Sequence, residues 1–148
     1  MKLQRRTLLK GLFTVAALVA VPRWLFAARP AGAFDADNPD AVIKDLFDTE
    51  IVASDSINLK IPDIAENGAV VPVTVSTDLA DVESIYVIVE NNPTPLAAMF
   101  VLSPRSVANV SVRIKMGESS PVRAIVKAGG KLYSASKEVK VTIGGCGG

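Results

Sequence analysis

The feature that most constrains the fold is a two-residue alternation of apolar and polar side chains, which begins near residue 58. Within residues 107–116, Val110, Val112 and Ile114 alternate with polar residues. Turn residues recur every eight to twelve positions or so, which is typical of sandwiches of antiparallel strands. We therefore expect an all-β, immunoglobulin-like antiparallel β-sandwich of about seven or eight strands, with a barrel as the alternative. The expected strands span residues 58–61, 70–76, 83–90, 96–102, 107–116, 122–128, 131–136 and 138–143.

Three local signals refine this expectation. Gly129-Gly130 predicts a hairpin over residues 127–131. Pro72 interrupts a valine-rich strand and predicts an edge position or a bulge there, because proline cannot donate a ladder hydrogen bond. Asn38-Pro39 supplies a helix cap and a proline in the first turn, so a short amphipathic helix is expected over residues 39–47.

The inventory of reactive side chains excludes most enzyme classes. The 148 residues, a usual length for one domain, include no histidine and one cysteine, Cys146. Cys-His catalysis, Ser-His-Asp triads and most zinc sites therefore lack their residues, and no metal or cofactor is expected. An immunoglobulin-type disulfide is impossible with one thiol.

The N-terminal segment resembles an export leader. Basic residues surround an uncharged run at residues 11–21, which is too short to span a bilayer as a helix, and Ala31-Gly32-Ala33 follows. We expect a cleaved signal peptide over residues 1–33 and no permanent membrane anchor. Arg5-Arg6 followed by Leu8-Leu9-Lys10 predicts the twin-arginine route, with a general secretory signal as the alternative. Folded export to the periplasm would let a partner without a signal travel with this chain.

Removal of the leader changes the charge of the protein. The whole chain has a net charge of +1, whereas residues 34–148 carry ten basic and fifteen acidic residues, for a net charge of −5. Nucleic-acid binding needs clustered lysine and arginine, so it is not expected.

The C-terminal segment is the most specific part of the sequence. Residues 144–148 read Gly144-Gly145-Cys146-Gly147-Gly148 and contain the single thiol. Glycine populates most of backbone space, so we expect a flexible arm that extends about 10 Å beyond residue 143, after a sandwich domain over residues 34–143. Four flanking glycines offer nothing to bury the thiol against, which favours use of Cys146 as a disulfide partner or a covalent attachment point.

This terminal pentapeptide, behind a twin-arginine leader and an all-β domain, resembles the SoxY family of sulfur carriers in bacterial thiosulfate oxidation. The similarity extends to residues 64–68 (Ile-Ala-Glu-Asn-Gly) and 92–97 (Asn-Pro-Thr-Pro-Leu-Ala).

The resemblance implies a covalent carrier and not an enzyme. Cys146 would be joined to thiosulfate by a c-type cytochrome, a hydrolase would release sulfate, and a sulfur dehydrogenase would oxidise the remaining sulfur. Gly144, Gly145, Gly147 and Gly148 would give reach and a thin cross-section. The resemblance also implies a heterodimer with a SoxZ-like subunit.

Two alternatives differ in function class. A non-catalytic envelope assembly or adhesion module would use Cys146 in an intermolecular disulfide, and an enzyme with its own active site is the third hypothesis. Sulfur adducts on Cys146 would support the carrier, whereas a disulfide-linked dimer alone would support assembly.

Overall fold

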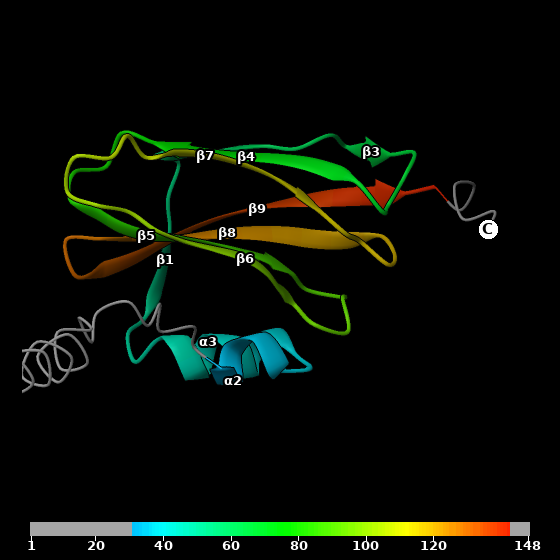
Figure 1. Cartoon of the computed structure of the whole chain (residues 1–148), viewed down its shortest axis with the longest axis horizontal. Helices are drawn as coiled ribbons and strands as arrows, with labels where there is room; N and C mark the ends of the chain where they lie inside the picture. The colour runs from blue at the N-terminus through cyan, green and yellow to red at the C-terminus, as the bar shows by residue number, and fades with distance from the viewer. Residues whose placement is uncertain (1–30, 143–148) are drawn as a thin grey trace, which may run out of the picture.

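The computed structural model of the chain describes residues 31–142, and two β-sheets packed face to face form its centre (Figure 1). Sheet A has the order β1-β9-β8-β5-β6, with β3 also paired to β9, and sheet B has the order β2-β4-β7. Two separate sheets confirm the sandwich and rule out the barrel. The elements are α2 (Ala31–Asp35), α3 (Pro39–Leu46), β1 (Ile51–Ala53), β2 (Ile57–Lys60), β3 (Ile64–Ala65), β4 (Val71–Thr77), β5 (Val82–Val89), β6 (Leu96–Val101), β7 (Asn109–Ile114), β8 (Ser120–Ala128) and β9 (Lys131–Val141).

The central hairpin of sheet A joins β8 to β9. Ala128 pairs with Lys131 across the turn, and Gly129 and Gly130 have φ angles of 55° and 73°. A two-residue turn with both central φ angles positive matches the twist of the strands, and glycine adopts it without strain. The predicted hairpin is therefore confirmed. The two strands expected over residues 131–136 and 138–143 are one strand, β9, which pairs with β8 from Lys131 to Val139.

Sheet B places Pro72 in its middle strand. β4 pairs with β2 on one side and β7 on the other, so the predicted edge position is wrong for the strand as a whole. The β2 pairing, however, ends at Lys60 and Thr74, whereas Pro72 pairs only with Arg113 of β7. Pro72 thus lies where β4 has one neighbour, and no second ladder requires its missing N–H.

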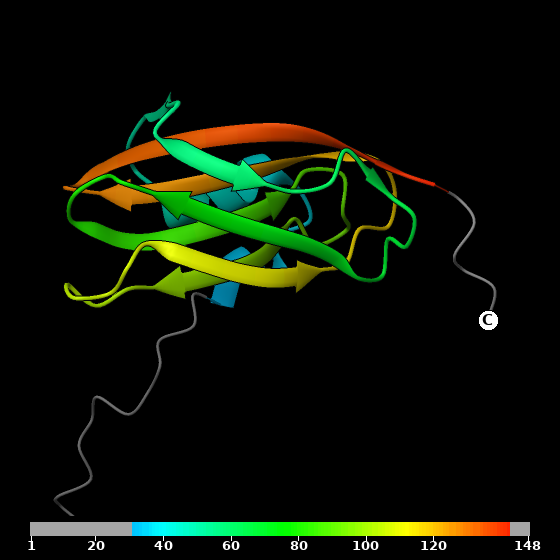
Figure 2. The same ribbon diagram turned by 90° about the horizontal axis from the view of Figure 1, so that it is seen from above.

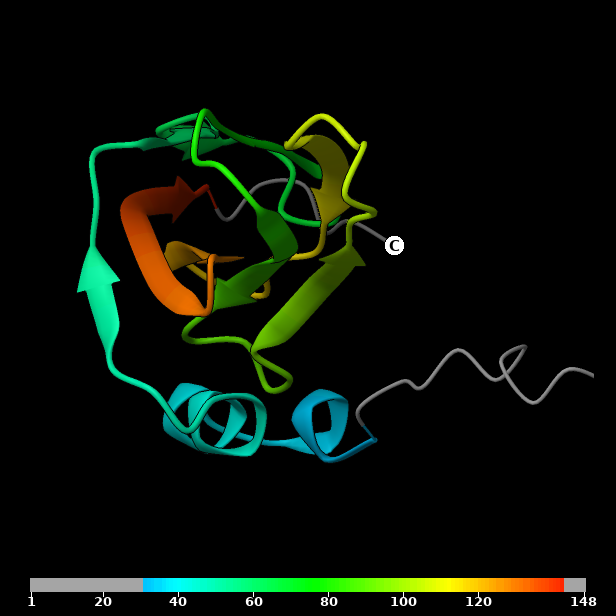
Figure 3. The ribbon, with the colours of Figure 1, turned by 90° about the vertical axis from the view of Figure 1, so that its left-hand side faces the viewer.

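Sheet A is covered on both faces. Ile85, Val87 and Val89 of β5 face the core between the sheets, whereas Tyr86 and Ile88 face the helices. All five side chains are buried because sheet B lies over one face and α2 with α3 lie over the other, as the end view shows (Figure 3). The architecture is consequently a sandwich with a third, helical layer.

The helical layer is built as the cap signal predicts. The Asn38 side-chain Oδ1 accepts a hydrogen bond from the Ala41 N–H at 2.8 Å, and Pro39 opens α3. The ring of Phe47, just after α3, meets the ring of Tyr86 edge to face at a centroid distance of 4.9 Å. This contact fixes the end of α3 on sheet A.

The sequence did not predict a helix before α3. Ala33, expected as the last leader residue, lies in α2 and is completely buried in the helical layer. The rest of the predicted leader, residues 1–30, and the predicted arm lie outside the described residues. Within residues 31–142, no helix is long and apolar enough to cross a membrane.

Candidate functional site

The predicted carrier residue is approached through the end of β9. β9 ends at Val141 (Figure 2), and Thr142 is the last described residue. In the sequence, Cys146 comes four positions later. Cys146, Gly144, Gly145, Gly147 and Gly148 all lie outside the described part. What the structure defines is the base from which they start, and we call Val141 and Thr142 the arm root.

β3 holds the arm root from one side. It pairs in parallel with β9, matching Ala65 with Val141, and the Thr142 N–H donates to the Ala65 carbonyl at 3.1 Å. One residue pair earlier, the Lys140 N–H donates to the Asp63 carbonyl at 2.9 Å. Because β3 is only two residues long, its role is local: it extends the sheet hydrogen bonding to the last described residue.

The loop between β7 and β8 holds the arm root from the other side. The Val141 N–H donates to the Ser119 Oγ at 2.9 Å. Ser119 stands just past the end of the β8–β9 ladder, so its hydroxyl takes the place of the next strand carbonyl. Successive residues of a strand point their N–H groups to opposite sides, so Val141 and Thr142 are held by different partners.

A close backbone approach packs a third segment against the arm root. The Met116 N–H donates to the Gly68 carbonyl at 2.7 Å. A Cβ atom on Gly68 would lie 2.5 Å from the Met116 carbonyl oxygen and 2.9 Å from the Val141 Cγ1. Only glycine fits here, which gives a physical reason for the glycine that ends residues 64–68.

Two asparagines join the neighbouring loops. The Asn92 side chain donates to the Lys115 carbonyl at 2.7 Å and accepts from the Gly117 N–H at 3.0 Å. The Asn91 side chain donates to the Ser119 carbonyl at 3.0 Å. The loop after β5 is thus tied to the loop that carries Ser119, and the second sequence segment of the resemblance, residues 92–97, begins in this network.

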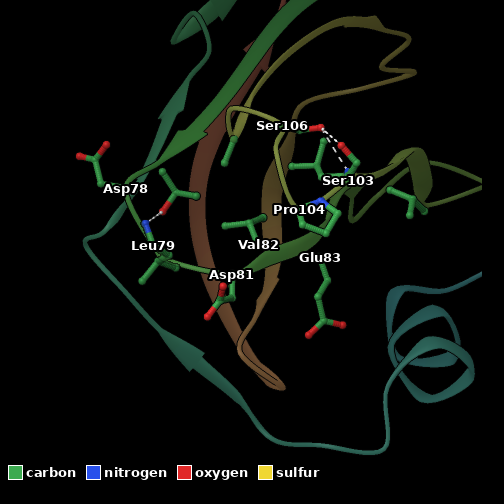
Figure 4. Close-up of a pocket in the computed structure, with 12 residues that line it drawn as sticks. Asp78, Leu79, Asp81, Val82, Glu83, Ser103, Pro104 and Ser106 are labelled. Atoms are coloured by element: carbon green, nitrogen blue, oxygen red, sulfur yellow. Dashed lines mark hydrogen bonds between the residues drawn. The ribbon is translucent and has the colours of Figure 1, made fainter.

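Charged groups at this end are partly neutralised by pairing. The Lys137 Nζ lies 2.8 Å from Asp63 and donates to the Ile61 carbonyl at 2.9 Å. Arg123 pairs with Glu90 at 2.5 Å. A hollow of about 390 Å³ lies at the opposite end of the sandwich, and its lining mixes the acidic residues Asp78, Asp81 and Glu83 with apolar and small polar side chains (Figure 4).

An ion pair beside this hollow shifts the pKa values of both its members. The Lys127 ammonium lies 2.9 Å from the Glu83 carboxylate. Its hydrogen bond is the main cause that lowers the pKa of Glu83, and the Gly130 N–H is the second. Glu83 in turn raises the pKa of Lys127. Among residues 31–142, no group of three or more His, Cys, Asp or Glu side chains could hold a metal ion. Glu83 and Lys127 form an exposed ion pair at the surface.

Sequence reasoning located the thiol but missed the residues that support its base. Ser119, Gly68 and the short strand β3 carry no periodic signal, since each acts through a contact with a distant part of the chain. The available signal was that residues 64–68 and 92–97 share the resemblance, and the structure brings both segments to the end of the sandwich that carries the arm root.

The comparisons with known proteins point to one family. The family model "Sulfur oxidation protein SoxY" matches residues 43–146, a span that includes Cys146. The solved sulfur carrier protein SoxY from Chlorobium limicola f thiosulfatophilum is similar at 42% identity and a TM-score of 0.63, over 70% of this chain and 94% of that chain.

More distant structures share the fold alone. A superoxide reductase (neelaredoxin) variant from Ignicoccus hospitalis is similar at 19% identity and a TM-score of 0.52, over 62% of this chain and 94% of that chain. No curated protein matches the sequence. Because the family model covers more than half of the chain and the similar carrier is covered almost completely, this chain belongs to the SoxY family of sulfur oxidation proteins.

Proposed function

We propose that this chain is a periplasmic carrier that holds thiosulfate-derived intermediates covalently on Cys146 while partner enzymes oxidise and hydrolyse them. The observation that carries the proposal is the position of the single thiol, four residues beyond a root that is hydrogen-bonded from both sides. At roughly 3.3 to 3.6 Å per residue, the Cys146 Cα can lie up to about 14 Å from that of Thr142. A fixed base with a short glycine-rich extension suits delivery of a bound group into another protein's cleft.

The loading step needs an external oxidant. The Cys146 thiolate and the outer sulfur of thiosulfate form an S–S bond, the thiol proton is released, and an electron pair passes to a c-type cytochrome. The product is a cysteine S-thiosulfonate. No histidine exists in the chain to act as a base, which supports activation of the thiol by the partner enzymes.

The unloading steps leave the carrier sulfur in place. A hydrolase adds water across the sulfur–sulfonate bond, which releases sulfate and two protons and leaves a deprotonated persulfide (S–S⁻) on Cys146. A sulfur dehydrogenase then removes further electrons from the outer sulfur, with water supplying its oxygen atoms. The S–S bond to Cys146 is retained until the last hydrolysis, so the arm can visit each enzyme in turn.

Export and assembly belong to the same proposal. The twin-arginine-type leader supports export of the folded chain, and a SoxZ-like subunit without its own signal would leave the cytoplasm as its heterodimer partner.

Intact-protein mass spectrometry tests the carrier proposal. Protein purified from the periplasm of thiosulfate-grown cells should carry sulfur or sulfonate adducts, and peptide mapping should place them on Cys146. A Cys146→Ser variant purified in parallel should carry none. A mass that shows only a disulfide-linked dimer would contradict the carrier and favour an assembly module.

A further inference from the structure

Among the strands of residues 31–142, β6 forms an edge that lacks the usual protection. An unpaired edge exposes backbone N–H and C=O groups that can pair with another chain, and proteins normally block such edges with charge, proline or short length. β1 and β3 are only three and two residues long, and β2 is four residues long and carries Lys60. β7 carries Arg113. β6, Leu96–Val101, has six residues, none of them charged.

The sequence around β6 is equally free of charge. Residues 91–104 form a run of 14 positions without Asp, Glu, Lys or Arg, the longest such run in the described part of the chain. Val101 at the end of β6 is 74% exposed, and Val107 in the following loop is 82% exposed. Such an edge, in a domain with a net charge of −5, matches an uncharged partner surface.

The hydrogen-bond pattern shows which backbone groups face outward. The Leu102 N–H donates to the Glu83 carbonyl of the neighbouring strand at 2.9 Å. Because residues of an antiparallel strand alternate in direction, Ala98 and Phe100 also point toward β5. Met99 and Val101 therefore point their N–H and C=O groups away from it. A bulge at Ala97, between the pairs Val87–Ala98 and Ile88–Leu96, ends the regular edge on the N-terminal side.

The opposite side of sheet A ends in two short strands. β1 covers residues 132–134 of β9, and β3 covers residues 140 and 141. Between them, Lys137 reaches across to Ile61 and Asp63. The end view shows β6 and β7 on the side of the sandwich away from β1 (Figure 3). Within residues 31–142, β6 is thus the edge of sheet A that is open to extension.

We propose that a partner subunit adds a β-strand to the outer edge of β6, pairing with Ala98–Val101 through the backbone groups of Met99 and Val101. Backbone groups in an extended strand are satisfied by another extended strand, so the partner contributes a strand with uncharged side chains. This inference rests on the proposed heterodimer and assigns its contact to one edge. The arm root stays clear of this edge, since its partners come from β3 and from the loop before β8.

Hydrogen exchange of the exported chain, alone and with its proposed partner subunit, tests the assignment. The Met99 and Val101 amides should exchange about tenfold or more slowly in the complex, while Ala98 and Phe100, already bonded to β5, change little. Protection that appears on β2 or β7 and leaves β6 unchanged would overturn the proposal. If the Met99 and Val101 amides exchange slowly in the chain alone, and more slowly as its concentration rises, the proposal is also overturned, because a second copy of this chain then occupies the β6 edge.

A pair of variants separates strand pairing from a simple apolar contact. Val101→Pro removes an outward N–H and no hydrogen bond to β5, and should weaken the complex about tenfold or more. Val101→Thr keeps the N–H and the branched shape and should stay within about threefold. Equal losses in both variants would contradict strand addition. If the proline variant loses the slow exchange of Ala98 and Phe100, Val101→Lys replaces it, because it keeps the N–H but puts a charge against an uncharged strand.

The outcome is distinct from that of the carrier proposal. Adducts on Cys146 are read by mass and do not require strand addition at β6. If Met99 and Val101 gain no protection in the complex but Cys146 carries adducts, strand addition at β6 is overturned and the carrier proposal stands. If the two amides are protected but Cys146 carries no adducts, the carrier proposal is overturned and strand addition stands.

Discussion

The Thr142 N–H donates to the Ala65 carbonyl oxygen at 3.1 Å, so sheet hydrogen bonding continues to a residue four positions before Cys146. One residue earlier, Val141 bonds in the opposite direction to Ser119. The predicted carrier arm therefore starts from a held base. Its length beyond that base, about 14 Å at full extension, limits how far the thiol can travel.

Gly68→Ala should destabilise the domain. The new Cβ would lie 2.5 Å from the Met116 carbonyl, so the backbone has to shift and its hydrogen bond to Met116 weakens. We expect a loss of about 1–3 kcal/mol in the free energy of unfolding, measured by urea denaturation.

Gly117→Ala is the matched control for this change. An added Cβ there meets only the Asn92 Oδ1 at 3.9 Å, so its effect should stay within about 0.5 kcal/mol. Equal losses for the two variants would show that the close approach at Gly68 is not what limits substitution.

Ser119→Ala should loosen the arm root more than the domain. The substitution leaves the Val141 N–H without its side-chain acceptor, and we expect the free energy of unfolding to fall by about 0.5–1.5 kcal/mol. Hydrogen exchange at Val141 should accelerate, whereas the β8–β9 ladder stays protected. Ser136→Ala, at an exposed position of β9, should change neither quantity. An unchanged exchange rate at Val141 in the Ser119 variant would count against this support.

The Glu83–Lys127 pair should give a measurable pH dependence. The pKa of Glu83 is lowered, so its stabilising effect is present above the usual value of 4.5 and is lost as the pH falls through the folded-state pKa. The pKa of Lys127 is raised, so its contribution is present below 10.5 and is lost as the pH rises through its folded-state pKa.

Lys127→Met checks the acid side of this dependence. In the variant, the NMR titration midpoint of Glu83 should move up, and the fall in thermal stability below the usual Glu83 pKa should become shallower. Because both groups are exposed, the change in stability should be small and should shrink further at high salt. A Glu83 midpoint that does not move would contradict the assigned cause.

Replacing Gly145 and Gly147 with valine should slow turnover without affecting the fold. Two β-branched side chains would stiffen and thicken the proposed arm, so entry into a narrow active site should suffer by about tenfold or more. Thermal unfolding should be unchanged. Valine at Ser136, an exposed β9 position, serves as the control, and unchanged turnover in the double variant would contradict the thin-arm argument.

Much of the sandwich could be predicted because its strands carry local signals. The β8–β9 hairpin follows from Gly129-Gly130, and β7 follows from its alternation, with Ile114 buried and Ser111 and Arg113 exposed. The short strands β1 and β3 could not be predicted, since two or three residues have no period and are ordered only by pairing with β9. β9 was predicted as two strands that meet at Lys137, but the Lys137 side chain bonds to Ile61 and Asp63 without breaking the strand.

The candidate site was predictable at the level of composition only. One cysteine among glycines predicts a covalent attachment point at Cys146, whereas Ser119 and Gly68 acquire their contacts through atoms from other segments. The helical layer was half predicted: α3 has a cap signal at Asn38, but α2 has none, and its Ala33 is ordered by burial against sheet A.

The most direct test of the carrier role is thiosulfate-dependent reduction of the cognate c-type cytochrome in a system reconstituted with the partner enzymes. The wild-type chain should support sustained electron transfer. Cys146→Ala, with an unchanged fold by circular dichroism and an intact heterodimer, should abolish it. Electron transfer retained by the Cys146→Ala variant at the wild-type rate would contradict the carrier account.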